Sequence, residues 1–362
     1  MLKKIDRYII QKFLSTFFFT VLIFVLIAVF IDFSEKVEKF VESEATRSQI
    51  AFEYYPNFIL FIVGMLWPLF ALIAVVYFTG RLAGNNEILS MLNAGMSFNR
   101  LLRPYLIAAT FLTVLHLAGT HYFIPRGNLA RLNLEYTYFE HDKDKGKKRN
   151  VHMFLSPDTK VYINFWRKRD STARDLRLER YADNQLVYML KARTAEWVEE
   201  PDKWRFRNYE IRTFDGREET LEVGRGEQMD TTMALHPNDF VDYQEQQTML
   251  TTPSLLSYLR KQKERGVGNT QKYQIELQRR TAEPITIFIL TIIGLAVAGR
   301  KVRGGMGIQL AIGIGLGALF VFMSRFAAVF AAGNAMPISI GMWMPNIVFG
   351  IVAIYLVRIA PK

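Results

Sequence analysis

Hydrophobic residues in this sequence gather in six blocks that polar stretches separate. Four blocks come close to the roughly 18 consecutive apolar residues typical of a membrane span, at residues 13–33, 58–78, 105–124 and 307–332. The two shorter ones lie at residues 284–298 and 338–357. Because about 20 helical residues cross the roughly 30 Å hydrocarbon layer of a bilayer, each block predicts a membrane-spanning helix. The pattern therefore indicates a polytopic α-helical membrane protein with six transmembrane helices in two groups of three.

A long, mostly polar insert separates the two groups of three. Its apolar residues recur at every second position, as Val161, Ile163 and Phe165 do, and such alternation is typical of half-buried β-strands. The apolar phase jumps near Asn208, which predicts a bulge in one strand. We therefore expect an inserted β-sandwich or β-jellyroll. The predicted domains are helices one to three, the β insert, and a connecting helix with helices four to six, at residues 1–124, 125–252 and 253–362.

The placement of lysine and arginine predicts how the six helices are oriented. Basic residues gather before the first block, around the loop between the second and third, between the fourth and fifth, and at the end of the chain. All these positions share one side of the membrane if there are six spans. The first loop on the opposite side, residues 34–54, has five glutamates against two lysines and one arginine. Positive charge favours the cytoplasmic side, so we expect both termini in the cytoplasm and the β insert outside it.

The loop between the second and third blocks has a helix signal of its own. Asn85 or Asn86 can accept hydrogen bonds from the free N–H groups that begin a helix. Glu87 suits the positive end of the helix dipole, and Gly95 suits a left-handed residue that ends the helix. The loop therefore predicts a short cytoplasmic helix at about residues 85–95.

This short helix has one apolar face, which Ile88, Met91 and Leu92 form with i, i+3, i+4 spacing. Two interpretations are open. The helix docks on a cytoplasmic partner through this face, or it lies against lipid headgroups at the membrane interface. Arg100 and Arg103 follow the helix rather than line its polar face, which favours the partner.

Composition narrows the functional classes. The chain has 362 residues, is 50% hydrophobic, and has a formal charge of +11 and no cysteine. An excess of basic over acidic residues often indicates a nucleic-acid partner. Here the apolar blocks indicate a membrane protein instead, and we expect no nucleic-acid partner. The sequence contains no phosphate-binding P-loop, no Gly-x-Ser-x-Gly and no His-Glu-x-x-His. We therefore predict no catalytic residue, no metal site and no bound cofactor, and expect any ATP to bind a partner.

Basic residues near the ends of the predicted spans form a second candidate site. Charges at membrane depth are costly and therefore often functional, and both arginine and lysine bind phosphate. Together they could form a cationic rim that faces lipid phosphates. The alternative is that each side chain extends to the aqueous interface. The residues selected are Lys36, Lys39, Arg131, Arg280 and Arg325.

Glycines recur through the fifth block. Gly313 and Gly317 have the spacing that lets two helices approach closely. Close packing and a sliding seam between helices both fit this spacing.

Several motifs together resemble the LptF/LptG permeases of the lipopolysaccharide exporter. They are the Ile-Asp-Arg-Tyr-Ile start, residues 80–97, and Tyr273-x-x-Glu276-x-x-x-Arg280-x-Ala282-x-Pro284. The three-plus-three layout with a β insert is also that family's. Residues 32–36 and Trp343-x-Pro345 look closer to LptG than to LptF.

The resemblance implies a half-transporter in the inner membrane of a bacterium. A homologous permease would complete an LptF/LptG heterodimer, and an LptB-like ATPase dimer in the cytoplasm would bind ATP and Mg²⁺. The β insert would be a periplasmic jelly roll that takes the acyl chains and passes them to LptC/LptA-like bridge proteins. The implied function is extraction of lipopolysaccharide from the inner membrane, by a chain without enzymatic activity of its own.

The resemblance also assigns roles to single residues. Glu87 matches the glutamate of the family's coupling helix, which inserts in a groove on the ATPase. Lys36 matches a basic residue that faces the phosphates of the lipid, and Arg131 lies near similar basic positions. Arg325 departs from the family's pattern.

Two other functions are weighed beside this one. A lipoprotein-releasing permease belongs to the same broad class, but such proteins usually have four spans. A membrane anchor that displays a β domain without transport belongs to another class. Copurification distinguishes the exporter from the anchor, because only the exporter needs an ATPase.

Overall fold

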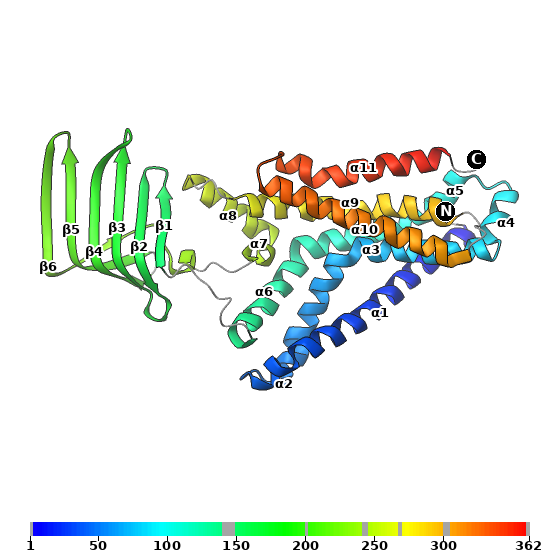
Figure 1. Cartoon of the computed structure of the whole chain (residues 1–362), viewed down its shortest axis with the longest axis horizontal. Helices are drawn as coiled ribbons and strands as arrows, with labels where there is room; N and C mark the ends of the chain where they lie inside the picture. Colours follow the sequence, from blue (N-terminus) through cyan, green and yellow to red (C-terminus); the bar gives the residue numbers. More distant parts are fainter. Residues whose placement is uncertain are drawn as a thin grey trace. The chain divides into compact units, whose positions relative to one another are not determined.

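The computed structural model describes residues 3–139, 149–199, 202–240, 245–266, 270–299 and 305–359. The chain divides into two compact units (Figure 1). The helical unit comprises Met1–Phe139, Gln247–Leu255 and Gln271–Lys362. The β unit comprises Glu140–Gln246 and Leu256–Thr270.

Six helical stretches of the described chain are long and apolar enough to cross a membrane, which confirms the predicted number. The first is α1 (Lys4–Glu42), and the second joins α2 (Arg47–Gln49), η1 (Ile50–Tyr54) and α3 (Tyr55–Gly84). The third joins α5 (Phe98–Ala118), η2 (Gly119–Phe123), α6 (Ile124–Leu134) and η3 (Glu135–Phe139). The last three are α9 (Gln271–Ala298), α10 (Gly305–Ala332) and α11 (Ile338–Arg358), and the shorter helices are α4 (Glu87–Asn93), α7 (Gln246–Met249) and α8 (Thr252–Glu264).

The third stretch continues past Ile124, where the sequence suggested that the first domain ends. Pro125 follows the π-helical turn η2 and lies in the first turn of α6. A proline is tolerated there because the missing N–H has no essential partner, and a π turn absorbs the local misfit. Residues 125–139 therefore belong to the helical unit rather than to the β domain.

Glycines of α10 pack directly against α3. A Cβ atom at Gly313 would lie 2.8 Å from a methyl group of Val76, and one at Gly317 would lie 2.6 Å from a methyl group of Leu69. Both distances are too short for any larger residue, so the geometry supports close packing at these glycines. The first turn of α1 and the end of α11 lie at the same end of the helical unit as α4 (Figure 1).

The β unit contains six antiparallel strands in the consecutive order β1-β2-β3-β4-β5-β6 (Figure 1). Their bounds are Arg149–Ser156, Thr159–Arg167, Thr172–Ala182, Gln185–Glu199, Lys203–Asp215 and Glu218–Thr232. The inserted antiparallel β domain is confirmed. The described strands pair in consecutive order within one sheet, as a meander. Alternation shows which segments are strands, but not which strands pair.

Two hydrogen bonds of buried side chains stabilise the β unit. The side chain of Trp204 is fully buried, and its Nε1 donates to the carbonyl of Leu235 at 2.8 Å. Asp239 accepts a hydrogen bond from Arg265 of the same unit at 2.9 Å. Burial opposes the Asp239 carboxylate, but the bonds from Arg265 and the His236 N–H outweigh it and hold the pKa of Asp239 below its usual range.

The predicted bulge is confirmed between β5 and β6. The pairing register shifts between Arg207 and Tyr209, and Asn208 adopts a left-handed backbone conformation with φ of 51°. Its Oδ1 accepts a hydrogen bond from the N–H of Gly226 at 2.9 Å. The extra residues come from β6, where Gly226 has φ of 78°.

Candidate functional site

The short helix expected between the second and third spans is present as α4. Its predicted N-terminal cap is wrong, because Asn86 is in a left-handed conformation and its side chain makes no capping hydrogen bond. A capping side chain needs an extended backbone to reach the free N–H groups. Asn85 instead donates from Nδ2 to Glu87 Oε1 at 3.3 Å, which orients that carboxylate.

The predicted end of α4 is confirmed. Gly95 has φ of 83°, and its N–H donates to the carbonyl of Leu92 at 3.0 Å. The N–H of Met96 donates to the carbonyl of Met91 at 3.1 Å. This pair of bonds is a Schellman motif, which requires a left-handed residue where Gly95 lies. Gly95 therefore has a structural role in ending the helix.

The apolar face of α4 turns inward. Ile88 is 2% exposed within the core of the helical unit, and Met91 and Leu92 are half-buried against that core. The chain's own helices therefore cover Ile88 fully and Met91 and Leu92 in part, so this predicted docking face is only partly open to another protein. Leu89 is 53% exposed and lies outside this apolar face. The surface that α4 leaves open consists of Leu89, Ser90 and Asn93, with Glu87 half-buried at its edge.

The first turns of α1 hold this region in place. Arg100 donates two hydrogen bonds to the carboxylate of Asp6, both at 2.7 Å, and Asp6 is 4% exposed. Tyr8 donates from its hydroxyl to Glu87 Oε2 at 3.1 Å. Glu87 therefore joins α4 to α1, and Asp6 joins α1 to α5. Sequence reasoning missed both contacts, although Asp6 and Tyr8 lie in the Ile-Asp-Arg-Tyr-Ile motif.

A second polar cluster lies near the far end of α1. Nζ of Lys36 contacts Asp32 at 2.9 Å and Glu135 at 2.7 Å, and it donates a hydrogen bond to the hydroxyl of Tyr54. The Lys36 side chain is only 16% exposed. The expectation that Lys36 faces lipid phosphates is therefore not met in this conformation, because two carboxylates already surround the ammonium group.

Arg131 belongs to the same cluster. It donates to Glu135 at 3.1 Å and to Oδ1 of Asn128 at 2.9 Å, and it is 7% exposed. Arg131 and Lys36 thus share Glu135, and the two cations balance the two carboxylates of Asp32 and Glu135. We call Asp32, Lys36, Arg131 and Glu135 the Lys36 network. The i, i+4 spacings of Asp32 with Lys36 and of Arg131 with Glu135 could have indicated two of its contacts, but the contact of Lys36 with Glu135 joins distant parts of the chain.

Arg280 also turns away from the membrane surface. It is 1% exposed and donates to Glu276, Thr252 and the carbonyl of Gln247, at 2.9, 3.1 and 3.1 Å. These bonds tie α9 to α7 and to the first residue of α8. The prediction that Arg280 is part of a lipid-facing rim is therefore wrong, because a buried guanidinium with satisfied donors cannot reach a phosphate.

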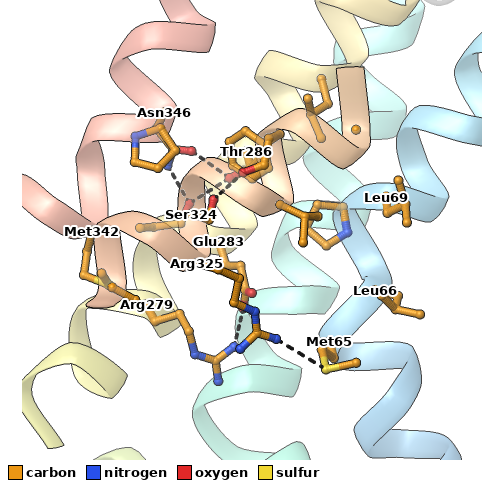
Figure 2. A pocket seen from close by; sticks show the side chains of 18 residues that line it. Met65, Leu66, Leu69, Arg279, Glu283, Thr286, Ser324, Arg325, Met342 and Asn346 are labelled. Atoms are coloured by element: carbon orange, nitrogen blue, oxygen red, sulfur yellow. Dashed lines mark hydrogen bonds and ion pairs between the residues drawn. The ribbon is translucent and has the colours of Figure 1, made fainter. Parts of the chain in front are cut away.

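Lys39 and Arg325 remain exposed. Arg325 lies at a cavity of about 230 Å³ between α3, α9, α10 and α11 (Figure 2). The five predicted cations are therefore not one rim. Two share the Lys36 network, Arg280 is buried in α9, Lys39 lies on the surface of α1, and Arg325 lies at the cavity.

The described residues contain no group of three histidine, aspartate or glutamate side chains placed to hold a metal ion. His116 is buried, and a ring nitrogen lies 3.1 Å from the carbonyl oxygen of Gly64.

Comparison with known proteins places this architecture in a family. A family model described as "Lipopolysaccharide export system permease LptF/LptG" matches residues 7–359. The comparison with curated proteins gives no match. The family match covers all six helical stretches and the β unit between the third and fourth. The chain therefore belongs to the LptF/LptG family of lipopolysaccharide export system permeases.

Proposed function

We propose that the chain is a permease half that extracts lipopolysaccharide from the inner membrane of a bacterium, driven by an ATPase in the cytoplasm. The observation that supports this best is the construction of α4. This helix is short, its apolar side packs on the helical unit, and Leu89, Ser90 and Asn93 face outward. Such a helix is firmly attached to the spans and still offers a surface to a separate protein.

The physical task supports an external source of energy. Each methylene group of an acyl chain that leaves the bilayer for water costs about 0.8 kcal/mol, so a lipid with several chains does not leave unaided. The sequence has no phosphate-binding loop for ATP. We infer that the energy comes from ATP hydrolysis in an LptB-like dimer and reaches this chain through contact with α4.

Tyr8 and Asp6 suggest how a movement of α4 reaches the membrane. Glu87 of α4 bonds to Tyr8, and Asp6 bonds to Arg100 of α5, the helix that follows α4. Both bonds end on the first turns of α1. We propose that α1 follows α4 and carries the movement to the Lys36 network, so that Lys36 can exchange a carboxylate for a substrate phosphate.

A homologous permease is the proposed partner within the membrane. The most apolar part of α1 is only 6% buried, and Phe19, Leu26 and Phe30 are 61%, 63% and 72% exposed. A helix so poorly covered by its own chain offers a wide apolar surface to a second permease and to the lipid between them. The β unit is proposed to pass the lipid to periplasmic bridge proteins. These proteins would bind to a sheet edge, β1 or β6, by strand addition.

The test uses the outward surface of α4. Leu89→Asp introduces a charge where an apolar contact with the ATPase is proposed, and it should abolish copurification of the ATPase from membranes. The matched control is Leu256→Asp on α8, because Leu256 is similarly exposed, at 49% against 53% for Leu89. Membrane insertion should be unchanged in both variants.

If both variants retained the ATPase equally, the proposed coupling role of α4 would be contradicted. If the unaltered chain copurified only with extracytoplasmic partners, the result would favour the anchor function instead.

A further inference from the structure

The cavity beside Arg325 is defined by side chains of four helices. Met65, Leu69, Phe320 and Val321 supply its apolar wall, and Arg279, Glu283 and Arg325 supply its charges (Figure 2). The close glycine contact between α10 and α3 reaches Gly317, which lines the cavity. We call this space the Arg325 cavity.

Its charges do not balance. Arg279 donates to Glu283 at 2.8 Å, and the neighbouring pair of Arg280 and Glu276 also cancels. Among the described residues, the only hydrogen bond of the Arg325 guanidinium is a weak one from Nη2 to the sulfur of Met65, at 3.8 Å. Glu283 lies within electrostatic reach of Arg325 but already binds Arg279. The cavity therefore has an excess of one positive charge.

Arg325 lies where a lipid headgroup can approach it. It is about two turns, or roughly 10 Å along the axis, before α10 ends at Ala332. A cation at that depth is costly unless it finds an anion or reaches the interface. Val321, one turn earlier on α10, lines the same cavity and is 40% exposed, so the cavity is accessible from the surface of the helical unit.

The volume limits the ligand. A space of about 230 Å³ equals about eight water molecules at about 30 Å³ each, and it is smaller than the roughly 300–1,000 Å³ of pockets that enclose drug-sized ligands. It cannot enclose a lipid with several acyl chains. It can accept one phosphate group and the nearest carbon atoms, while the chains stay in the bilayer.

We propose that the Arg325 cavity binds the phosphate group of one anionic phospholipid of the surrounding membrane. The guanidinium of Arg325 binds the phosphate, and the apolar wall contacts the glycerol end of the lipid. A basic pocket between transmembrane helices is a known way to hold an anionic headgroup. This lipid is distinct from the transported one, and the inference does not rest on the proposed export function.

The experiment is a lipid titration of the purified full-length chain in detergent, followed by native mass spectrometry. The probes are phosphatidylglycerol, phosphatidylethanolamine with the same acyl chains, and inorganic phosphate. The unaltered chain should bind one phosphatidylglycerol in preference to the other two. Arg325→Gln should weaken that binding at least about tenfold, since the hydrogen bonds to a charged phosphate are lost, whereas Arg325→Lys should retain the preference.

Two further variants separate the cavity from general attraction. Arg126→Gln removes the same charge from an exposed arginine of α6 and should leave phosphatidylglycerol binding unchanged. Ala328→Leu fills the cavity without a change of charge and should weaken binding as Arg325→Gln does. Equal loss in Arg126→Gln and Arg325→Gln, or normal binding by Ala328→Leu, would overturn the proposal. Inorganic phosphate that binds as tightly as the lipid would overturn the assignment to a phospholipid.

Discussion

At the start of α1, the bond between Tyr8 and Glu87 lies at the surface, whereas at its far end polar side chains meet in the interior. Tyr8, which bonds to Glu87, is 40% exposed. Lys36 and Glu135 have side chains that are only 16% and 10% exposed. A surface bond is easily exchanged for a bond to another protein, but a buried pair resists separation because each charge would lose its partner. The comparison suggests that α1 is adjustable where a motor would act and held firmly where the lipid would be bound.

The largest expected effect comes from the buried end. Lys36→Met leaves Asp32 and Glu135 with Arg131 as their only cationic partner in the network, so one carboxylate is buried without compensation. Breaking such a pair typically costs about 3–5 kcal/mol, and thermal unfolding in detergent should show a lower Tm. The double variant Lys36→Met/Glu135→Gln restores the balance and should recover part of the loss. An unchanged Tm in Lys36→Met would contradict the structural role of the network.

An intermediate effect is expected where α1 meets α5. Arg100→Gln removes two hydrogen bonds from Asp6, but the N–H of Lys3 still donates to that carboxylate at 2.9 Å. The Tm should fall by less than in Lys36→Met. Arg103→Gln, an exposed arginine of the same helix, is the control and should leave the Tm unchanged. A fall as large as that of Lys36→Met would show that the two ends of α1 do not differ as proposed.

The smallest effect is expected for Tyr8→Phe, which removes only the hydroxyl that bonds to Glu87. Substitutions at exposed positions usually change stability by no more than about 0.5 kcal/mol, so the Tm should stay close to that of the unaltered chain. The same unfolding assay checks this. A loss comparable to that of Arg100→Gln would mean that the bond is an essential part of the fold.

The sequence was informative where a property depends on neighbouring residues. The apolar blocks predicted the six spans, because span length is a local property. Gly95 ended α4 as expected, because a left-handed residue favours glycine. The bulge at Asn208 was visible as a change in alternation. Each of these needs only a few consecutive residues.

The sequence was misleading where a property depends on distant partners. Lys36 looked available for phosphate because Glu135 lies about 100 residues later along the chain. The apolar face of α4 looked external because its cover comes from other helices of the unit. The order of the β strands was also beyond reach, since alternation contains no information on pairing. These residues were correctly selected as chemically important, but their contacts could not be assigned.

We propose that α4 meets the ATPase with its exposed side, which includes Leu89. The chain has no cysteine, so a single introduced thiol is unique. We would compare Leu89→Cys, which is outward, with Ile88→Cys, where the native side chain is 2% exposed, using a thiol-reactive photocrosslinker in whole membranes. The account predicts a crosslink from position 89 to the ATPase and none from position 88. A crosslink from position 88 without one from position 89 would contradict it.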